Sequence, residues 1–386
     1  METFNVAPRR LPSIRVCLTM APRLPALWVL PLLCLAGCQH YGPRSIVADR
    51  LPYNEAIAVS WKEQTLLNIV KLRYMDTPFF LDVPQITSGY TLQQVGTVNS
   101  GVFPPVSNLA SFAQQLGLTM NYQAAYQDRP TISYQPQTNS QFIRNLTQPI
   151  NPGSVLFLLQ SGYPADLVFD LTVESVNGVK NRSVSGGQLR PADPEFEFIT
   201  RALRKAQIAG HVGIRVEKEK VDPKEKREAK ETVAFFFRDK DVDAELAKEL
   251  AEVRKMLKID PKAGEFKVVF GATAANPNEI AILSRSVLRI LSELATFVDV
   301  PLEHQVRGIA PPIGSVEGEA GPDFHVLSGA TKPADPYICV CYEGRWFWVE
   351  KTDFRSKRTL SYVLVLLAFS DTGTRESLPV ITIQAN

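Results

Sequence analysis

A long stretch without a single charged side chain, residues 83–127, sets the strongest limit on how this chain can fold. It contains no Asp, Glu, Lys or Arg over 45 residues, in a chain that is 21% charged. Its second half alternates apolar residues with small or amide-bearing ones, a period of two that is typical of a strand with one apolar face. A weaker run from Tyr90 to Val98 matches it, and Asn99 to Asn108 between them is rich in turn residues. The stretch therefore predicts a long β-hairpin with one apolar face and one uncharged polar face.

Two environments suit such a hairpin, and the sequence leaves both open. The ordinary one is packing on the protein's own core or on a partner. The other is insertion into an outer membrane, where strands of about 9–11 residues turn apolar side chains toward lipid and charge on that face is costly. One hairpin cannot close a barrel, so insertion needs several copies. The candidate membrane-contact or partner-contact residues are Tyr90, Leu92, Leu116, Leu118, Met120, Tyr122 and Tyr126.

The N-terminus has the pattern of an export signal. Four arginines and one glutamate precede a short apolar run, Ala26 to Leu35, which is well below the roughly 20 residues of a membrane-spanning helix. Small residues and a cysteine end the run as Leu35-Ala36-Gly37-Cys38, which resembles a bacterial lipoprotein signal. We expect residues 1–37 to be removed and Cys38 to be acylated and to tether the chain to a membrane. An ordinary cleaved signal or a signal anchor is the alternative, and translation can also begin at Met20.

The position after the cysteine indicates which membrane. By the sorting rule of enteric lipoproteins, Gln39 in place of Asp favours the outer membrane, with the protein on its periplasmic side. Residues 1–37 hold four of the 42 Lys and Arg and one of the 40 Asp and Glu, which leaves 38 cations against 39 anions. A nearly neutral mature chain gives no support to nucleic-acid binding through bulk charge.

Only two cysteines remain beyond Cys38 in the mature chain. Cys339 and Cys341 alternate along one predicted strand and so face the same side. We expect two buried, reduced thiols. A strained disulfide and a metal or redox site are the alternatives.

The remaining patterns predict an α+β fold: an N-terminal helix and the uncharged β-hairpin region, followed by a C-terminal mixed α/β domain. Its expected parts are a signal (1–37), a tether without periodicity (38–52), a helix and β-hairpin domain (53–182) and a mixed α/β domain (190–386) with a charged insertion (217–231). Within them we expect helices at 55–74, 279–297 and 356–369, a hairpin of 337–342 with 346–349, and a last strand at 380–383. We also expect a strand from 167 to the turn at Asn177-Gly178, for which a helix is not excluded.

The chain contains no recognised catalytic or metal-binding motif. The four histidines, His40, His211, His304 and His325, lack metal-ligand spacing, and no nucleophile motif accompanies them. We therefore predict no catalytic site, no metal and no cofactor. If the chain is an enzyme, the long loop with His304, Asp323 and His325 is the first place to look. The acids Asp166, Asp170 and Glu174 recur every four residues, which we interpret as a solvated face.

Several short motifs resemble a group of uncharacterised lipoproteins of Gram-negative bacteria. They are Asn68-Ile69-Val70-Lys71-Leu72-Arg73-Tyr74 with Asp76-Thr77-Pro78, Gln160-Ser161-Gly162, Phe347-Trp348, and Ser356-Lys357-Arg358-Thr359. The resemblance implies an envelope location and no particular activity.

The sequence as a whole predicts a lipid-anchored envelope protein with a non-catalytic assembly or scaffold role. Its partners would be the membrane, envelope proteins and further copies of itself, without nucleic acid. The alternative is a subunit of an oligomeric outer-membrane export pore that contributes the hairpin at about 83–127, a layout similar to that of the curli secretion lipoprotein.

Overall fold

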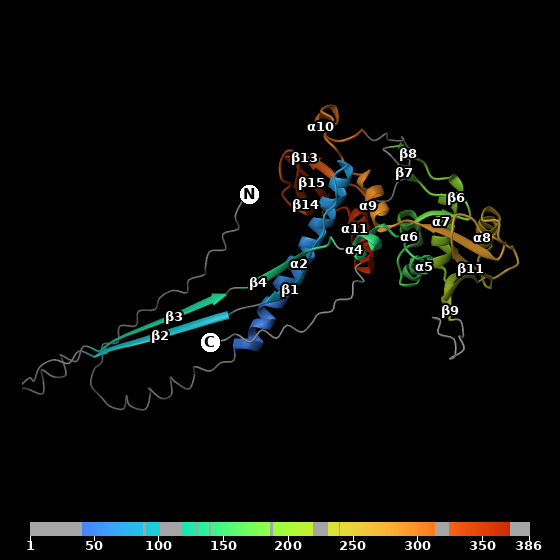
Figure 1. The fold of residues 1–386 in the computed structure, drawn as a ribbon. Coiled ribbons are helices and arrows are strands. Elements are labelled where there is room, and N and C mark those ends of the chain that lie inside the picture. Colours follow the sequence, from blue (N-terminus) through green and yellow to red (C-terminus); the bar gives the residue numbers. More distant parts are fainter. Residues whose placement is uncertain are drawn as a thin grey trace, which may run out of the picture. The chain divides into compact units, whose positions relative to one another are not determined.

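A computed structural model describes residues 41–87, 90–100, 118–128, 130–138, 140–185, 188–218, 231–238, 240–312 and 324–370 (Figure 1). The described residues form a mixed α+β fold, which confirms the predicted class. The chain divides into two compact units. The hairpin unit consists of Met1–Tyr53 and Leu81–Pro136, and the main unit consists of Asn54–Phe80 and Gln137–Asn386.

The hairpin unit contains two antiparallel strand pairs. β1 (Leu81–Thr87) pairs with β4 (Thr131–Pro136), with a register shift around Pro84, which has no N–H to donate. β2 (Tyr90–Ser100) pairs with β3 (Leu118–Asp128) without interruption, from Tyr90 opposite Asp128 to Ser100 opposite Leu118. The charge-free stretch therefore supplies all of β2 and all of β3 except its last residue.

Helix α2 (Tyr41–Arg73) is longer than the pattern indicated. We expected the helix to begin at residue 55 and residues 38–52 to form a tether without periodicity, but residues 41–52 are helical. An apolar stripe marks a helix that packs on a core, and this segment has none. A helix without such a stripe gives no periodic signal, so the sequence pattern could not show it. The C-terminal end of α2 does pack, since Leu66, Ile69 and Val70 are fully buried in the main unit.

The main unit is built around a six-stranded sheet in the order β6-β5-β12-β11-β10-β9. β11 and β12 are parallel and all other neighbours are antiparallel. The strands are β5 (Val173–Val176), β6 (Val179–Lys180), β9 (Val212–Lys218), β10 (Glu231–Phe237), β11 (Glu265–Phe270) and β12 (Glu279–Ser284). β5 and β6 come before the expected domain boundary at 182–190, and β9 to β12 come after it. All six strands belong to one sheet, so this boundary does not separate two domains.

Helices and two smaller sheets complete the main unit (Figure 1). β13 (Leu327–Gly329), β15 (Arg345–Glu350) and β14 (Pro336–Tyr342) form a three-stranded sheet, and β7 (Ser183–Ser185) pairs with β8 (Gln188–Arg190). The helices are α4 (Ser140–Thr147), α5 (Pro152–Gln160), α6 (Ala165–Thr172), α7 (Pro194–Ile208), α8 (Ala244–Met256), α9 (Val287–Ala295), α10 (Leu302–Val306) and α11 (Phe354–Ser370). The β14–β15 hairpin and the helix α11 confirm their predictions. The charged residues 219–230, the loop 313–323 and the expected strand at 380–383 lie outside the described residues.

The strand expected from 167 to the turn at Asn177-Gly178 is wrong in its first part, where the alternative of a helix holds, and right in its second. Residues 165–172 form helix α6, and the strand begins only at Val173. Nearly every residue of α6 is buried, so apolar side chains fill consecutive positions and the spacing could not separate helix from strand.

The long helix expected at 279–297 is also wrong in its first third. Residues 279–284 form β12, a strand buried on both faces, and a continuous apolar run is typical of such a strand. The helix α9 begins at Val287 because Ser286 caps it, with its hydroxyl accepting the N–H of Arg289 at 3.2 Å.

Candidate functional site

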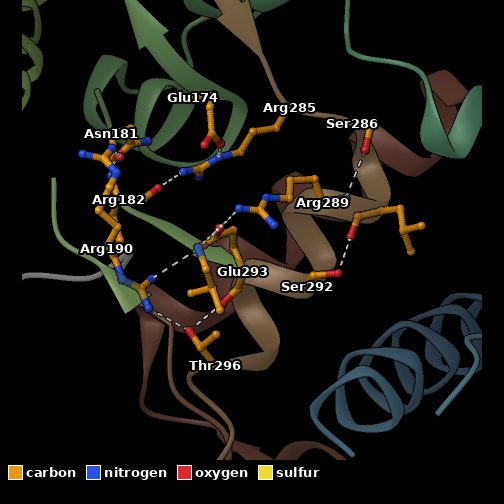
Figure 2. A network of polar contacts seen from close by, with 12 residues as sticks. Glu174, Asn181, Arg182, Arg190, Arg285, Ser286, Arg289, Ser292, Glu293 and Thr296 are labelled. Carbon is orange, nitrogen blue, oxygen red and sulfur yellow. Dashed lines mark hydrogen bonds and ion pairs between the residues drawn. The ribbon is translucent and has the colours of Figure 1, made fainter. Parts of the chain in front are cut away.

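The connection between β12 and α9 places an arginine inside the main unit. The Arg285 side chain is only 3% exposed, and its Nε lies 3.0 Å from Oε2 of Glu174. Its Nη1 donates to the carbonyl oxygen of Asp170 at 2.8 Å, and its Nη2 donates to that of Arg182. Arg285 therefore holds β12, the end of α6 and the chain after β6 together (Figure 2).

A buried carboxylate lies on α9. Glu293 is 2% exposed, and its Oε1 accepts the backbone N–H of Val184 at 2.8 Å and lies 3.3 Å from Nη2 of Arg289. Arg182 lies over the ring of Phe297 at 4.3 Å, and its Nη2 donates to the hydroxyl of Thr296 at 2.8 Å. Nη1 of Arg182 is 3.8 Å from Oε2 of Glu293, an ion-pair distance that is too long for a hydrogen bond.

Asn181 completes an arginine–carboxylate network, whose other members are Glu174, Arg182, Arg285, Arg289 and Glu293. Its Nδ2 donates to the carbonyl oxygens of Val173 at 2.7 Å and Asp170 at 3.0 Å, and its Oδ1 accepts the N–H of Arg182. Arg190 donates to the carbonyl oxygen of Asn181 (Figure 2). The segment between β6 and α7 contains only the short strands β7 and β8. Side-chain hydrogen bonds to backbone carbonyl oxygens hold it in place.

A cavity of about 300 Å³ lies beside this network. Its lining includes the arginines Arg182, Arg201, Arg285 and Arg358. It also includes the acids Asp166, Asp170, Glu197 and Glu293. Two acid oxygens, Oε2 of Glu293 and Oδ1 of Asp166, are buried and have no hydrogen-bond donor from the described part of the protein. The cavity therefore has a charge-balanced polar lining with two donor-less acid oxygens close by, which makes it the candidate site for a small polar ligand.

The sequence interpretation missed this site. We expected Asp166, Asp170 and Glu174 to form a solvated face, yet two of them line the cavity and Glu174 pairs with the buried Arg285. The available signal was a single arginine, Arg285, between two serines inside a long apolar run. An arginine in such a place has to find acceptors within the fold.

The histidines that we singled out have separate partners. The buried His304 shares a hydrogen bond of 2.8 Å between its Nδ1 and the hydroxyl of Tyr74. Nε2 of His325 lies 3.2 Å from Oδ2 of Asp299, and both side chains are exposed. No hydrogen bond or ion pair joins the two histidines within the described residues, and Asp323 lies outside them.

Tyr74 belongs to the end of α2, where a polar cluster docks the helix. Burial raises the pKa of Tyr74 to about 12, with Arg73 opposing the shift. Burial likewise lowers the pKa of Arg73, whose Nη1 donates to the carbonyl oxygen of Pro311 at 2.7 Å. The backbone N–H of Thr77 and the hydroxyl of Tyr342 both donate to Asp76 and lower its pKa.

The motif of residues 68–78, one of those on which the resemblance rests, therefore has a structural role at the end of α2. Besides Tyr74 and Asp76, it supplies the buried Asn68, whose side chain bonds both the N–H and the carbonyl oxygen of Phe79 at 2.9 Å. These contacts fix the chain as it leaves α2.

The two cysteines of β14 are free, as we expected. Cys339 is partly buried, and burial raises the pKa of its thiol. Cys341 is exposed, so the expectation of two buried thiols is wrong for this residue. Within the described residues, no group of three or more His, Cys, Asp or Glu is arranged to hold a metal ion.

The hairpin candidates fall at matching positions of the β2–β3 ladder. Leu92 is opposite Tyr126, Val98 is opposite Met120, and Tyr90 and Tyr122 follow the same alternation. Because directly opposed residues share a face, the register assigns Tyr90, Leu92, Leu118, Met120, Tyr122 and Tyr126 to one face of the ladder. Leu116 and the predicted lipidation site Cys38 lie outside the described residues.

Among the described residues, no helix combines the length and the hydrophobicity that crossing a membrane requires. Comparisons of the chain with protein-family models, with curated proteins and with solved structures gave no significant match.

Proposed function

We propose that this chain is a lipid-anchored envelope protein on the periplasmic side of the outer membrane, with a non-catalytic assembly or scaffold role. The anchor would be the acylated Cys38. The working surface would be the β2–β3 ladder, uncharged except for Asp128 at its end, through which the protein contacts a partner.

The register of the ladder is the observation that carries the contact role. Opposed pairs such as Leu92 with Tyr126 and Val98 with Met120 put most of the apolar residues of both strands on one face. The other face is mostly polar and receives Thr91, Gln93, Val95, Thr97 and Asn99 from β2 and Gln127, Ala125, Gln123, Asn121 and Thr119 from β3. A two-stranded ribbon is only marginally stable alone in water, so an apolar face of this length calls for a covering surface.

Site-specific photo-crosslinking in cells tests this role. A photoreactive residue at Leu92 should capture an envelope protein, and one at Gln93, the neighbouring position on the opposite face, should not. The capture from Leu92 should disappear in the Cys38→Ser protein, which has no thiol to acylate. Equal capture from both positions, or capture that survives Cys38→Ser, would contradict the proposal.

An oligomeric outer-membrane export pore is the second candidate. The observation that favours it is strand length, since β2 and β3 each have 11 residues, which matches a membrane-spanning strand. The pore requires detergent-stable rings and a hairpin that protease cannot reach in intact outer membranes. A monomer after detergent extraction, cleaved between residues 99 and 108 from the periplasmic side, would contradict it.

A further inference from the structure

We propose that the cavity beside the arginine–carboxylate network binds a neutral sugar, one monosaccharide unit. The site lies wholly within the main unit and does not depend on the proposed function. Its size gives the first constraint. About 300 Å³ is the lower limit for ligand pockets, so it suits one small ring and not an extended chain.

Charge gives the second constraint. The lining holds four arginines and four acids, so its formal charge is zero. The deepest cation, Arg285, is already bonded to Glu174 and to backbone carbonyl oxygens. A ligand with net charge would therefore gain little attraction and would lose its hydration.

The unsatisfied acceptors give the third constraint. Oε2 of Glu293 and Oδ1 of Asp166 are buried, and the nearest cationic nitrogens, on Arg182 and Arg204, are 3.8 Å and 3.9 Å away. Each oxygen is closed off from solvent, so a ligand hydroxyl reaches it after the carboxylate turns toward the cavity. Arg182 and Arg289 already surround Glu293 and would repel an added ammonium, whereas a hydroxyl donates without adding charge.

The cavity also offers donors and an apolar wall. Arg201 lies exposed at the cavity, and its Nε donates to the carbonyl oxygen of Glu197 at 3.2 Å, while its terminal nitrogens make no hydrogen bond within the described residues. Those nitrogens can donate to a hydroxyl or ring oxygen. Leu167 and Phe196 supply apolar surface for the C–H face of a ring. A sugar hydroxyl can accept from a guanidinium and donate to a carboxylate, and the C–H face of the same sugar ring can pack on the apolar wall.

Calorimetric titration of the purified full chain tests the site. The protein is kept in an amine-oxide detergent, because a detergent with a sugar headgroup would compete. The probes are glucose, galactose, mannose and N-acetylglucosamine at millimolar concentration, with lysine and glutamate as charged probes. We expect at least one of the four sugars to bind, and neither charged probe to bind as tightly.

Three variants locate the binding. Ala192→Trp puts a ring into the cavity from a partly exposed position and should weaken binding by more than tenfold. Arg201→Ala removes one charged donor and should weaken it about tenfold. Lys205→Ala, on the same helix but outside the cavity, should leave it unchanged.

Three results would overturn the proposal: no binding of any of the four sugars, tighter binding of lysine or glutamate, or equal affinity in Arg201→Ala and Lys205→Ala. The last comparison uses two exposed positions, so it remains decisive if Ala192→Trp does not fold.

Discussion

Replacing Arg285 by methionine measures how strongly the arginine–carboxylate network stabilises the main unit. Methionine keeps an unbranched apolar stem and removes the guanidinium. The change takes away the ion pair with Glu174 and the hydrogen bonds to the carbonyl oxygens of Asp170, Leu171 and Arg182. In the variant, these three carbonyl oxygens lose the hydrogen bonds that the guanidinium donates.

The expected loss is large because the arginine is buried. Removing one partner of a buried, hydrogen-bonded ion pair costs about 3–5 kcal/mol. Glu174 is 29% exposed and can regain water, which limits the loss on the carboxylate side. We therefore expect Arg285→Met to lower the free energy of unfolding by about 3–4 kcal/mol.

Arg215→Met is the matched control. Arg215 pairs with Glu265 at 2.9 Å, close to the 3.0 Å of Arg285 with Glu174, but the two side chains are 58% and 39% exposed. An exposed pair contributes about 0–1 kcal/mol, so this variant should unfold almost like the unchanged protein. Urea unfolding followed by tryptophan fluorescence gives both values from the shift of the midpoint. A loss below about 1 kcal/mol for Arg285→Met, or equal losses for the two variants, would refute the reasoning.

Three further predictions concern α2 and α9. Burial raises the pKa of Tyr74 to about 12, so the folded state keeps this proton where the unfolded chain, with a tyrosine pKa of about 10, loses it. The stability that neutral Tyr74 contributes is complete below pH of about 10 and falls as the pH rises toward 12, and Tyr74→Phe should flatten that fall in urea midpoints measured across this range. Asn68→Ala leaves the N–H and the carbonyl oxygen of Phe79 without their side-chain partner and should lower the free energy of unfolding by about 2 kcal/mol, measured in the same assay. Ser286→Ala removes the cap of α9 and should cost about 1 kcal/mol, with Ser286→Thr retaining most of it.

Each of these predictions has a result that contradicts it. For Tyr74, it is an unchanged pH profile in the phenylalanine variant. For Asn68, it is a loss no larger than that of Asn145→Ala, which changes a partly exposed residue of α4. For Ser286, it is a threonine variant that is as unstable as the alanine variant.

Elements with a clean period could be predicted from the sequence. The hairpin of β14 with β15 turns at Glu343 and Gly344, both of which have positive φ, and its flanking aromatic residues mark both strands. Residues 41–52 and 165–172 could not be predicted this way. The first segment lacks an apolar face and the second is buried almost throughout, so neither displays the one-sided pattern that identifies a helix.

The candidate site was beyond the reach of pattern reasoning for a different reason. Arg285 bonds to residues more than a hundred positions earlier in the chain, and most of its acceptors are carbonyl oxygens, which every residue type supplies. Glu293 likewise accepts the N–H of Val184 across 109 positions of the chain. Only the fold brings them together, whereas the lipidation proposed for Cys38 and the face of the ladder follow from local spacing.

Mass spectrometry of the natural protein, extracted from its membrane, examines the anchor on which the proposed role depends. The account predicts a mature chain that begins at Cys38 and carries acyl chains on that residue, with residues 1–37 absent. A bare Cys38, or a chain that still carries residues 1–37, would contradict it.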